Sequence, residues 1–337
     1  MSQHTLTVPP PPGTRQRPRS LASRPSRSDS VFRTVSYGAG ATTVGIMLAV
    51  GFFLAVRAGD ALSVTGFSFL TEQQWSPETQ KFGIAAVLSG TVTIAIIAMC
   101  VSVPLALGTS LLISEIVPPR VKTALISLVD LMAAVPSVVY GLFGLFFMQE
   151  NIIPVARWIS GHFGWIPVFA VTDGSGHALT EASAFTSSAF IAGLVVALMV
   201  VPTQTSVMRE AFSQAPAGER EGAYALGSTR WGMIRSVVLP FGRGGIIGGT
   251  MLGLGRALGE TIAVYLIISP VFTINLQVLK TGSNSVSALI ANRYGEASSF
   301  GLSALMAAGL VLFLMTLVVN FTASSIVARS RSGAQTN

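Results

Sequence analysis

One strongly apolar stretch of the chain contains two opposite charges four residues apart, Arg256 and Glu260. An arginine near the middle of a membrane span costs at least about 2.5–3.5 kcal/mol on insertion scales, so it normally faces a cavity or a partner. Its guanidinium presents a planar fork of donors that matches the oxygens of phosphate and similar oxyanions. Glu260 could accept the proton of hydrogen phosphate, or it could form an i,i+4 ion pair with Arg256. The sequence leaves both interpretations open, and an exchange between them could gate a transport path.

The residues around this pair are unusually small. Eight glycines lie between 242 and 259, and small residues four apart, such as Gly249 and Gly253, let membrane helices approach closely. On a continuous helix Gly249, Gly253, Arg256 and Glu260 lie on one stripe. The sequence therefore predicts a helix on which the closely packed glycine face continues into Arg256 and Glu260.

The elements that position these residues are predicted to be membrane helices. Half of the 337 residues are hydrophobic and a tenth are charged, whereas soluble domains contain about a quarter charged residues. Six apolar segments reach the roughly 20 residues that span a bilayer, at 36–57, 83–113, 121–148, 185–208, 241–268 and 299–328. We expect an all-α polytopic membrane protein with about six transmembrane helices.

The third segment is the least uniform, because it contains Asp130 and Pro136. Asp130 either pairs with a basic group near a gate or reaches toward the membrane interface, and we include it among the candidate pathway residues. Pro136 is expected to produce an ordinary kink in a continuous membrane helix.

The positions of Lys and Arg predict the orientation. With the N-terminus in the cytoplasm, the inside carries about three times as many of these residues as the outside, so both termini are expected to be cytoplasmic. Residues 1–35 are rich in Arg, Pro and Ser, which predicts a disordered basic tail, followed by a transmembrane domain at 36–328 and a short cytoplasmic tail at 329–337. The external segments are too short for a domain of ordinary size, so substrate capture is assigned to another chain.

The loop at 209–240 is predicted to form a helix–turn–helix. A short helix fits 218–226, and Gly227 can end it in the left-handed conformation. One of the hydroxyl residues that follow can cap a second helix, which Pro240 prevents from continuing easily. Such a loop fits an amphipathic connector on the membrane surface as well as a docking element.

The spacing in this loop resembles the coupling loop of bacterial ABC importer permeases. The family pattern is Glu-Ala-Ala, three residues, Gly, nine residues and Ile-x-Leu-Pro. The corresponding residues here are Glu221-Gly222-Ala223, Gly227 and Val237-x-Leu239-Pro240. Gly222 departs from the family Ala and should loosen the first helix by about 1 kcal/mol; Val237 stands for Ile. The resemblance implies a type I ABC importer permease fold, in which Glu221 and its neighbours contact a separate ATPase.

Four further stretches are similar to permeases of this kind. Gly255–Val264 resembles the fifth-span signature of the phosphate-specific permeases, in the form of the C-type subunit, and Phe69–Gly83 resembles the first external loop of that subunit. The stretch from Ser102–Gly108 to Glu115 resembles the second span of the wider family, and Pro136–Gly141 resembles its third span. The similarity covers roughly residues 65–328.

This resemblance implies import of inorganic phosphate across the bacterial plasma (inner) membrane, with Arg256, Glu260 and Thr261 on the pathway. It also implies an A-type permease as heterodimer partner, two copies of a cytoplasmic ATPase and an extracytoplasmic phosphate-binding protein. The chain lacks the Gly-x-x-x-x-Gly-Lys-Ser/Thr loop of nucleotide sites, since none of its three lysines follows a glycine. We therefore expect no enzyme activity, cofactor, metal or nucleic acid on this chain, with ATP and Mg²⁺ bound by the ATPase.

Two alternatives remain at this point. A permease of the same architecture could carry another oxyanion, such as molybdate or sulfate, because an arginine suits any of them. A secondary transporter or channel could use Arg256 and Glu260 as an ion relay, although many such proteins contain inverted repeats and no convincing repeat is found in this sequence.

Overall fold

The computed structural model describes residues 27–332, and nearly all of its regular elements are helices. Residues up to Val50 and residues from Gly51 onward form two separate units, and the account below concerns the second. The helices are α1 (Arg27–Arg57), α2 (Gly59–Thr65), α3 (Ala85–Leu111), α4 (Pro119–Ala134), α5 (Ser137–Phe143), α6 (Gln149–Phe163), α7 (Ala189–Ser213), α8 (Ala217–Ala225), α9 (Arg230–Met233), α10 (Leu239–Phe241), α11 (Arg243–Gly259), α12 (Ile262–Ile267), α13 (Val286–Arg293) and α14 (Ser299–Ser332). Strands β1 (Trp75–Ser76) and β2 (Lys81–Phe82) pair antiparallel as a small hairpin.

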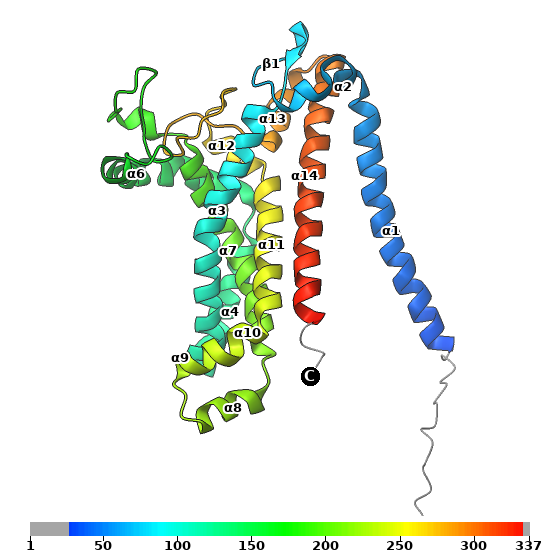
Figure 1. Ribbon diagram of the computed structural model, residues 1–337, viewed down its shortest axis with the longest axis vertical. Helices are drawn as coiled ribbons and strands as arrows, with labels where there is room; N and C mark the ends of the chain where they lie inside the picture. The colour runs from blue at the N-terminus through cyan, green and yellow to red at the C-terminus, as the bar shows by residue number, and fades with distance from the viewer. Residues whose placement is uncertain (1–26, 333–337) are drawn as a thin grey trace, which may run out of the picture. The chain divides into compact units, whose positions relative to one another are not determined.

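Helices α3, α7 and α11 form the centre of the second unit (Figure 1). Their shared core is built from small and branched apolar side chains, among them Ala98 of α3, Val196 of α7 and Ala257 of α11. Gly193 lets α7 approach α3 closely, since a Cβ there would lie 2.6 Å from Cγ2 of Ile97. Helix α14 packs against α11, and helices α4 and α5 pack against α7.

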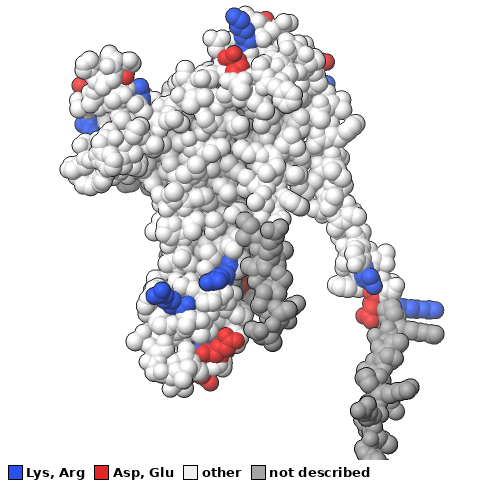
Figure 2. All heavy atoms as spheres, in the orientation of Figure 1, with Lys and Arg blue, Asp and Glu red and all other residues white. Residues whose placement is uncertain are grey.

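The long helices are apolar enough to cross a membrane. Among the described residues five helices meet the length and hydropathy of a span, and a sixth is obtained if the bent pair Arg230–Phe241 and Arg243–Gly259 counts as one. On the visible face of the unit, charged side chains gather at the end that carries α8 and α9 and at the opposite end, leaving an almost uncharged band between them (Figure 2). The prediction of a helical membrane protein with about six spans is confirmed.

The inner ends of the two predicted tails are helical where the structure describes them. Helix α1 begins at Arg27, so the predicted disordered segment does not include residues 27–35, whose apolar and polar residues extend the first helix; residues 1–26 lie outside the described part. Helix α14 continues to Ser332, past the predicted boundary at 328, and residues 333–337 also lie outside it.

The third predicted segment, 121–148, is not one kinked helix. Helix α4 ends at Ala134, Val135 is extended with ψ of 128°, and α5 starts at Ser137. The cause is Pro136, which disfavours the helical conformation of the residue before it. The Tyr140 hydroxyl donates a 2.9 Å hydrogen bond to the carbonyl of Met132, which satisfies a helix-end acceptor. The helix here that has the length and hydropathy of a span is Ser137–Phe163.

The fifth predicted segment, 241–268, is also interrupted. The chain bends by 67° between Arg230–Phe241 and α11, at Gly242. Contrary to the prediction, Pro240 does not end the second helix of the loop, since helical structure continues to Phe241. Helix α11 then ends at Gly259, and Glu260 is extended with ψ of 127° before α12 begins. The membrane segment therefore consists of two helices that meet at Glu260 and Thr261.

The glycines of α11 provide a stability prediction. A Cβ on Gly253 would meet Val200 Cγ1 at 2.6 Å and would also overlap Gln204, whereas a Cβ on Gly248 would meet nothing within 4 Å. Gly253→Val is therefore expected to destabilise the chain by about 1–3 kcal/mol through overpacking. Gly248→Ala, on the same helix, should be neutral or stabilising by up to about 1 kcal/mol. Thermal unfolding of the two purified variants checks this, and equal midpoints would contradict the close α7–α11 packing.

Candidate functional site

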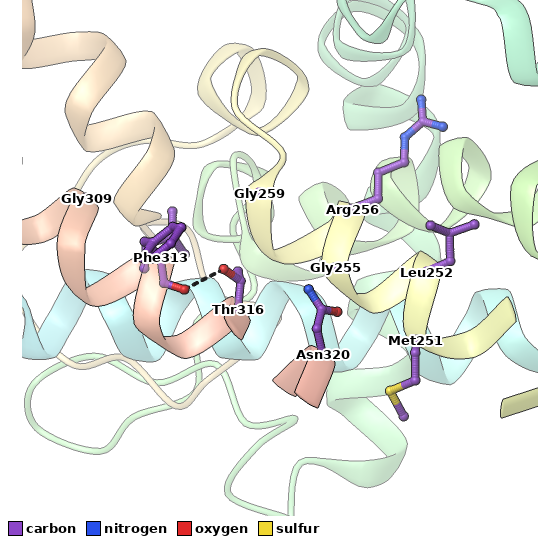
Figure 3. Close-up of a pocket in the computed structure, with 10 residues that line it drawn as sticks. Met251, Leu252, Gly255, Arg256, Gly259, Gly309, Phe313, Thr316 and Asn320 are labelled. Carbon is purple, nitrogen blue, oxygen red and sulfur yellow. Dashed lines mark hydrogen bonds between the residues drawn. The ribbon is translucent and has the colours of Figure 1, made fainter. Parts of the chain in front are cut away.

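Arg256 lies on α11, one turn before the helix ends, and its side chain is half-buried. Its Nη1 donates a 3.1 Å hydrogen bond to the Thr203 hydroxyl of α7. Figure 3 shows the guanidinium pointing away from Asn320 and Phe313, which belong to α14. Within the described chain this is the side-chain hydrogen bond of Arg256, and no carboxylate forms an ion pair with it. The guanidinium therefore retains donors for an anion.

A cavity of about 540 Å³ lies between α11 and α14. Arg256 is among its lining residues, although its guanidinium is directed toward α7. The α11 lining is mostly backbone and apolar side chains, and Asn320 and Thr316 of α14 add polar groups. Gly255 faces Asn320, since a Cβ there would be in van der Waals contact with Oδ1 of Asn320 at 3.5 Å. The lining residues are Met251, Leu252, Gly255, Arg256, Gly259, Gly309, Leu312, Phe313, Thr316 and Asn320.

Glu260 and Thr261 form the break between α11 and α12. Because Glu260 has left the helix, it does not share a helical face with Arg256, and the described chain contains no ion pair between them. Its carboxylate accepts from the backbone N–H of Ala263 at 3.2 Å, and its carbonyl accepts from the Ser287 hydroxyl at 2.6 Å. Thr261 donates to the carbonyl of Gly259 at 3.2 Å. The break is thus held by its own side chains and by α13.

Asp130 is exposed on α4 and accepts a 3.4 Å hydrogen bond from the Ser206 hydroxyl of α7. Ser206 lies about one turn from Thr203, the partner of Arg256. Asp130 and Arg256 therefore bond to side chains on neighbouring turns of α7, and the described chain contains no direct contact between the two.

The structure adds Thr203 to the predicted set, because its hydroxyl accepts a hydrogen bond from Arg256. A signal for Thr203 was present, because residues 203–206 are four consecutive polar residues inside an apolar helix.

The predicted helix–turn–helix is present as α8, α9 and a π-helical turn at Ile234–Val238. Gly227 has φ of +81°. The N–H of Ser228 bonds the carbonyl of Ala223 at 3.0 Å, and that of Gly227 bonds Tyr224 at 2.9 Å, which is the hydrogen-bond pattern of a Schellman motif. Thr229 caps α9 by accepting from Gly232 N at 3.1 Å. The predicted terminator and cap are confirmed.

The residues of the family pattern are distributed over both faces of this loop. Glu221, Gly222 and Gly227 are exposed, while Ala223 packs beside the small core formed by Met233, Ile234 and Val238. Leu239 and Pro240 lie in α10, immediately before the 67° bend. Three large side chains add an apolar outer surface, since Leu226, Trp231 and Tyr224 are 91%, 61% and 45% exposed.

Substitutions at Gly222, inside α8, and at Gly227, two residues after its end, are expected to have opposite effects. A side chain at Gly227 must adopt the left-handed conformation, which costs about 1–2 kcal/mol, whereas Gly222→Ala removes a helix-interior glycine and gains up to about 1 kcal/mol. Neither new Cβ would meet an atom within 4 Å, so backbone preference alone acts. Amide hydrogen exchange across 217–227 should become severalfold faster in Gly227→Ala and slower in Gly222→Ala. Unchanged exchange in both variants would show that the stability of α8 does not determine the exchange rate of this loop.

The chain matches known proteins over most of its length. The family of binding-protein-dependent transport system inner membrane components matches residues 106–332. A phosphate transport system permease protein PstC of Pasteurella multocida is 38% identical over 279 residues, covering 81% of this chain and 83% of the relative. A PstC of Mesorhizobium japonicum is 33% identical over 330 residues, covering 96% of this chain and 98% of the relative.

Solved structures share the fold at low identity. A bacterial ABC transporter involved in the import of alginate aligns with a TM-score of 0.57 and 17% identity, over 90% of this chain and 98% of the transporter chain. The MetNI methionine ABC transporter in an inward-facing conformation aligns with a TM-score of 0.51 and 13% identity, over 73% of this chain and 95% of its own. The chain therefore has the fold of ABC importer permeases and belongs to the family of binding-protein-dependent transport system inner membrane components, with the PstC phosphate permeases among its relatives.

Proposed function

We propose that this chain is the C-type permease subunit of an ATP-driven importer of inorganic phosphate. The observation that carries the proposal is the arginine inside the membrane segment. Arg256 is half-buried, and its guanidinium points away from the α11–α14 cavity toward α7, where its hydrogen-bond partner Thr203 is neutral. A membrane arginine without a carboxylate partner suits an anionic cargo, and a guanidinium fork fits phosphate oxygens. The similarity to phosphate permeases over most of the chain supports phosphate as that anion.

The path itself is assigned to Arg256, Glu260, Thr261 and Asp130. Arg256 binds the anion, while Glu260 and Thr261 form a non-helical break one turn after it. Non-helical backbone at membrane depth is tolerated where it is buried in protein or lines a cavity, which agrees with this assignment. Asp130 of α4 accepts a hydrogen bond from Ser206, which lies one turn from Thr203 on α7. Its negative charge would repel an anion that moved toward α4.

The complex requires chains other than this one. An A-type permease would form the heterodimer and close the open side of the α11–α14 cavity, two ATPase copies would bind ATP and Mg²⁺, and an extracytoplasmic phosphate-binding protein would deliver the substrate. Among the described residues no cluster of His, Cys, Asp or Glu could hold a metal ion. The α8 end faces the cytoplasm in this arrangement, as the Lys and Arg distribution predicts, with both termini on that side.

Transport would proceed by alternating access. ATP binding closes the ATPases and displaces α8, whose exposed side chains Glu221 and Leu226 meet them. The displacement reaches α11 through α9 and α10, across the bend at Gly242. Because α11 carries Arg256, this movement exposes the anion site first to one side of the membrane and then to the other.

Purification of the tagged chain from its native membranes tests the ATP-driven assembly. We expect a second permease and an ATPase in stoichiometric amounts, and phosphate uptake by the cells should stop when the ATPase is deleted. Purification of the chain alone, together with uptake that continues without the ATPase, would contradict the proposal and favour a secondary transporter.

A further inference from the structure

The cytoplasm-directed loop is joined to the spans by one buried ion pair. Nη1 of Arg220, on α8, lies 3.0 Å from Oε2 of Glu115, in the π-helical turn Leu112–Ile116 that follows α3. Nη2 of the same guanidinium donates a 2.6 Å hydrogen bond to the carbonyl of Phe212, at the end of α7. One side chain therefore connects α8 with the ends of two central helices.

This pair differs from the other ion pairs of the described chain. The pairs Asp173–His177 and Arg293–Glu296 are local and largely exposed, and such pairs contribute little because water screens them. Glu115 is only 3% exposed and Arg220 is 23% exposed. Removing one partner from a buried pair leaves an uncompensated charge, so the remaining charge is strongly penalised.

Arg220 also faces away from the proposed ATPase contact. Its neighbours Glu219 and Glu221 are exposed, whereas Arg220 points into the protein. Helix α8 thus presents one face outward, while its inner face carries Ala223, which packs beside Met233, and Arg220. The two hydrogen bonds of Arg220 connect this inner face to the ends of α3 and α7.

The pair has unused hydrogen-bonding capacity. Oε1 of Glu115 and Nε of Arg220 are buried and have no hydrogen-bond partner within the described chain. A guanidinium and a carboxylate can form two parallel bonds, so a small shift of α8 can convert the present single bond into a two-point contact. A hydrogen bond between Arg220 and Glu115 can therefore persist while α8 moves, whereas an apolar contact has no directional bond to maintain.

We propose that Arg220 is a positioning residue that transmits the displacement of α8 to α3 through Glu115 and to α7 through Phe212. The path continues in the same helix, because α7 also carries Thr203, the hydrogen-bond partner of Arg256. The inference deepens the proposed function and rests on it, since it assumes that α8 receives the movement of an ATPase. It assigns a role to two residues outside the family pattern of the loop.

The test uses the complete complex with its ATPase and binding protein in proteoliposomes. Arg220→Gln removes both bonds, Glu115→Gln leaves the bond to Phe212, and Arg220→Lys keeps the charge with fewer donors. The variant Glu115→Leu/Arg220→Met replaces the pair by apolar side chains, which restores stability in other buried pairs. Arg293→Gln, which breaks an exposed pair at 3.9 Å, is the matched control. The readouts are ATPase retention, hydrolysis stimulated by the binding protein, and phosphate imported per ATP.

We expect the apolar double variant, Arg220→Lys and Arg293→Gln to retain the ATPase. Arg220→Gln and Glu115→Gln each leave one buried charge unpaired, so these two variants can lose stability and with it some ATPase. Arg220→Gln and the double variant should import about tenfold less phosphate per ATP, with Glu115→Gln and Arg220→Lys intermediate and Arg293→Gln unchanged. Normal import per ATP in the double variant would show that the pair only stabilises the fold, and normal import in Arg220→Gln would equally overturn the inference.

The same experiment distinguishes an error in the proposed substrate from an error in the role of Arg220. If the unaltered complex hydrolyses ATP in response to its binding protein but imports no phosphate, the phosphate assignment fails. The role of Arg220 is then judged from the stimulated hydrolysis, which should be lost in Arg220→Gln and the double variant and retained in Arg293→Gln. Retained stimulation in the first two variants would overturn the inference whatever anion is carried.

Discussion

Arg256→Gln is expected to lower ATP-dependent phosphate uptake by about 100-fold, while the protein remains folded and assembled. A hydrogen bond to a charged group contributes about 1.5–3 kcal/mol, and the loss of two such bonds to a bound anion corresponds to a rate effect of this order. Gln keeps a donor for the Thr203 hydroxyl, with which Arg256 forms a 3.1 Å bond, so the α7–α11 packing should survive. Initial rates of phosphate uptake at equal membrane abundance measure the effect.

Three companion variants distinguish charge, orientation and location. Arg256→Lys keeps the charge without the planar fork and should be intermediate. Thr203→Val removes the group that orients the guanidinium and should cost severalfold. Arg157→Gln changes an exposed arginine on α6 and should be neutral. Near-normal uptake by Arg256→Gln would remove Arg256 from the transport path.

Leu226→Asp is expected to release the ATPase from the complex. Leu226 is 91% exposed at the end of α8, and burying a leucine side chain in an interface contributes about 2 kcal/mol, equivalent to roughly 30-fold in affinity. An aspartate adds the cost of burying a charge, so its effect should exceed that of Leu226→Ala. Retention of the ATPase on the tagged chain during salt washes measures the difference.

Leu276→Asp is the control for this prediction. Leu276 is 65% exposed and lies in the segment between α12 and α13, at the end of the unit opposite α8 (Figure 1). The same change of chemistry there should leave ATPase retention unaltered. If both variants retain the ATPase equally, the outer surface of α8 is not its docking site.

The membrane architecture was predictable because hydropathy alone marks a span. The segments at 83–113 and 185–208 correspond to α3 and α7 within a few residues. The third and fifth segments were wrong as continuous helices for different reasons. Pro136 is a visible signal, but membrane helices also tolerate proline as a kink, so the sequence does not distinguish a kink from a break. At Glu260 no proline is present, and the break depends on the Ser287 hydroxyl from α13.

The loop was predictable in detail because its signals are local. A glycine that must be left-handed and a threonine at a helix start act within four residues, and both are found where expected. Long-range pairs have no such signal. Arg220 and Glu115 are 105 residues apart, and the Arg256–Thr203 contact depends on the close packing of α7 against the α11 glycines. The proposed pairing of Arg256 with Glu260 assumed a continuous helix, which the structure does not have.

Uptake of radiolabelled phosphate by the complex in proteoliposomes tests the central claim most directly. The assembly should contain both permeases, with ATP inside with the ATPase and the binding protein outside. We expect uptake that requires ATP, is abolished by excess unlabelled phosphate and is unaffected by excess sulfate or molybdate. Uptake that sulfate or molybdate suppresses as strongly as phosphate does, or the absence of ATP-dependent phosphate uptake, would contradict the assignment of this chain to phosphate import.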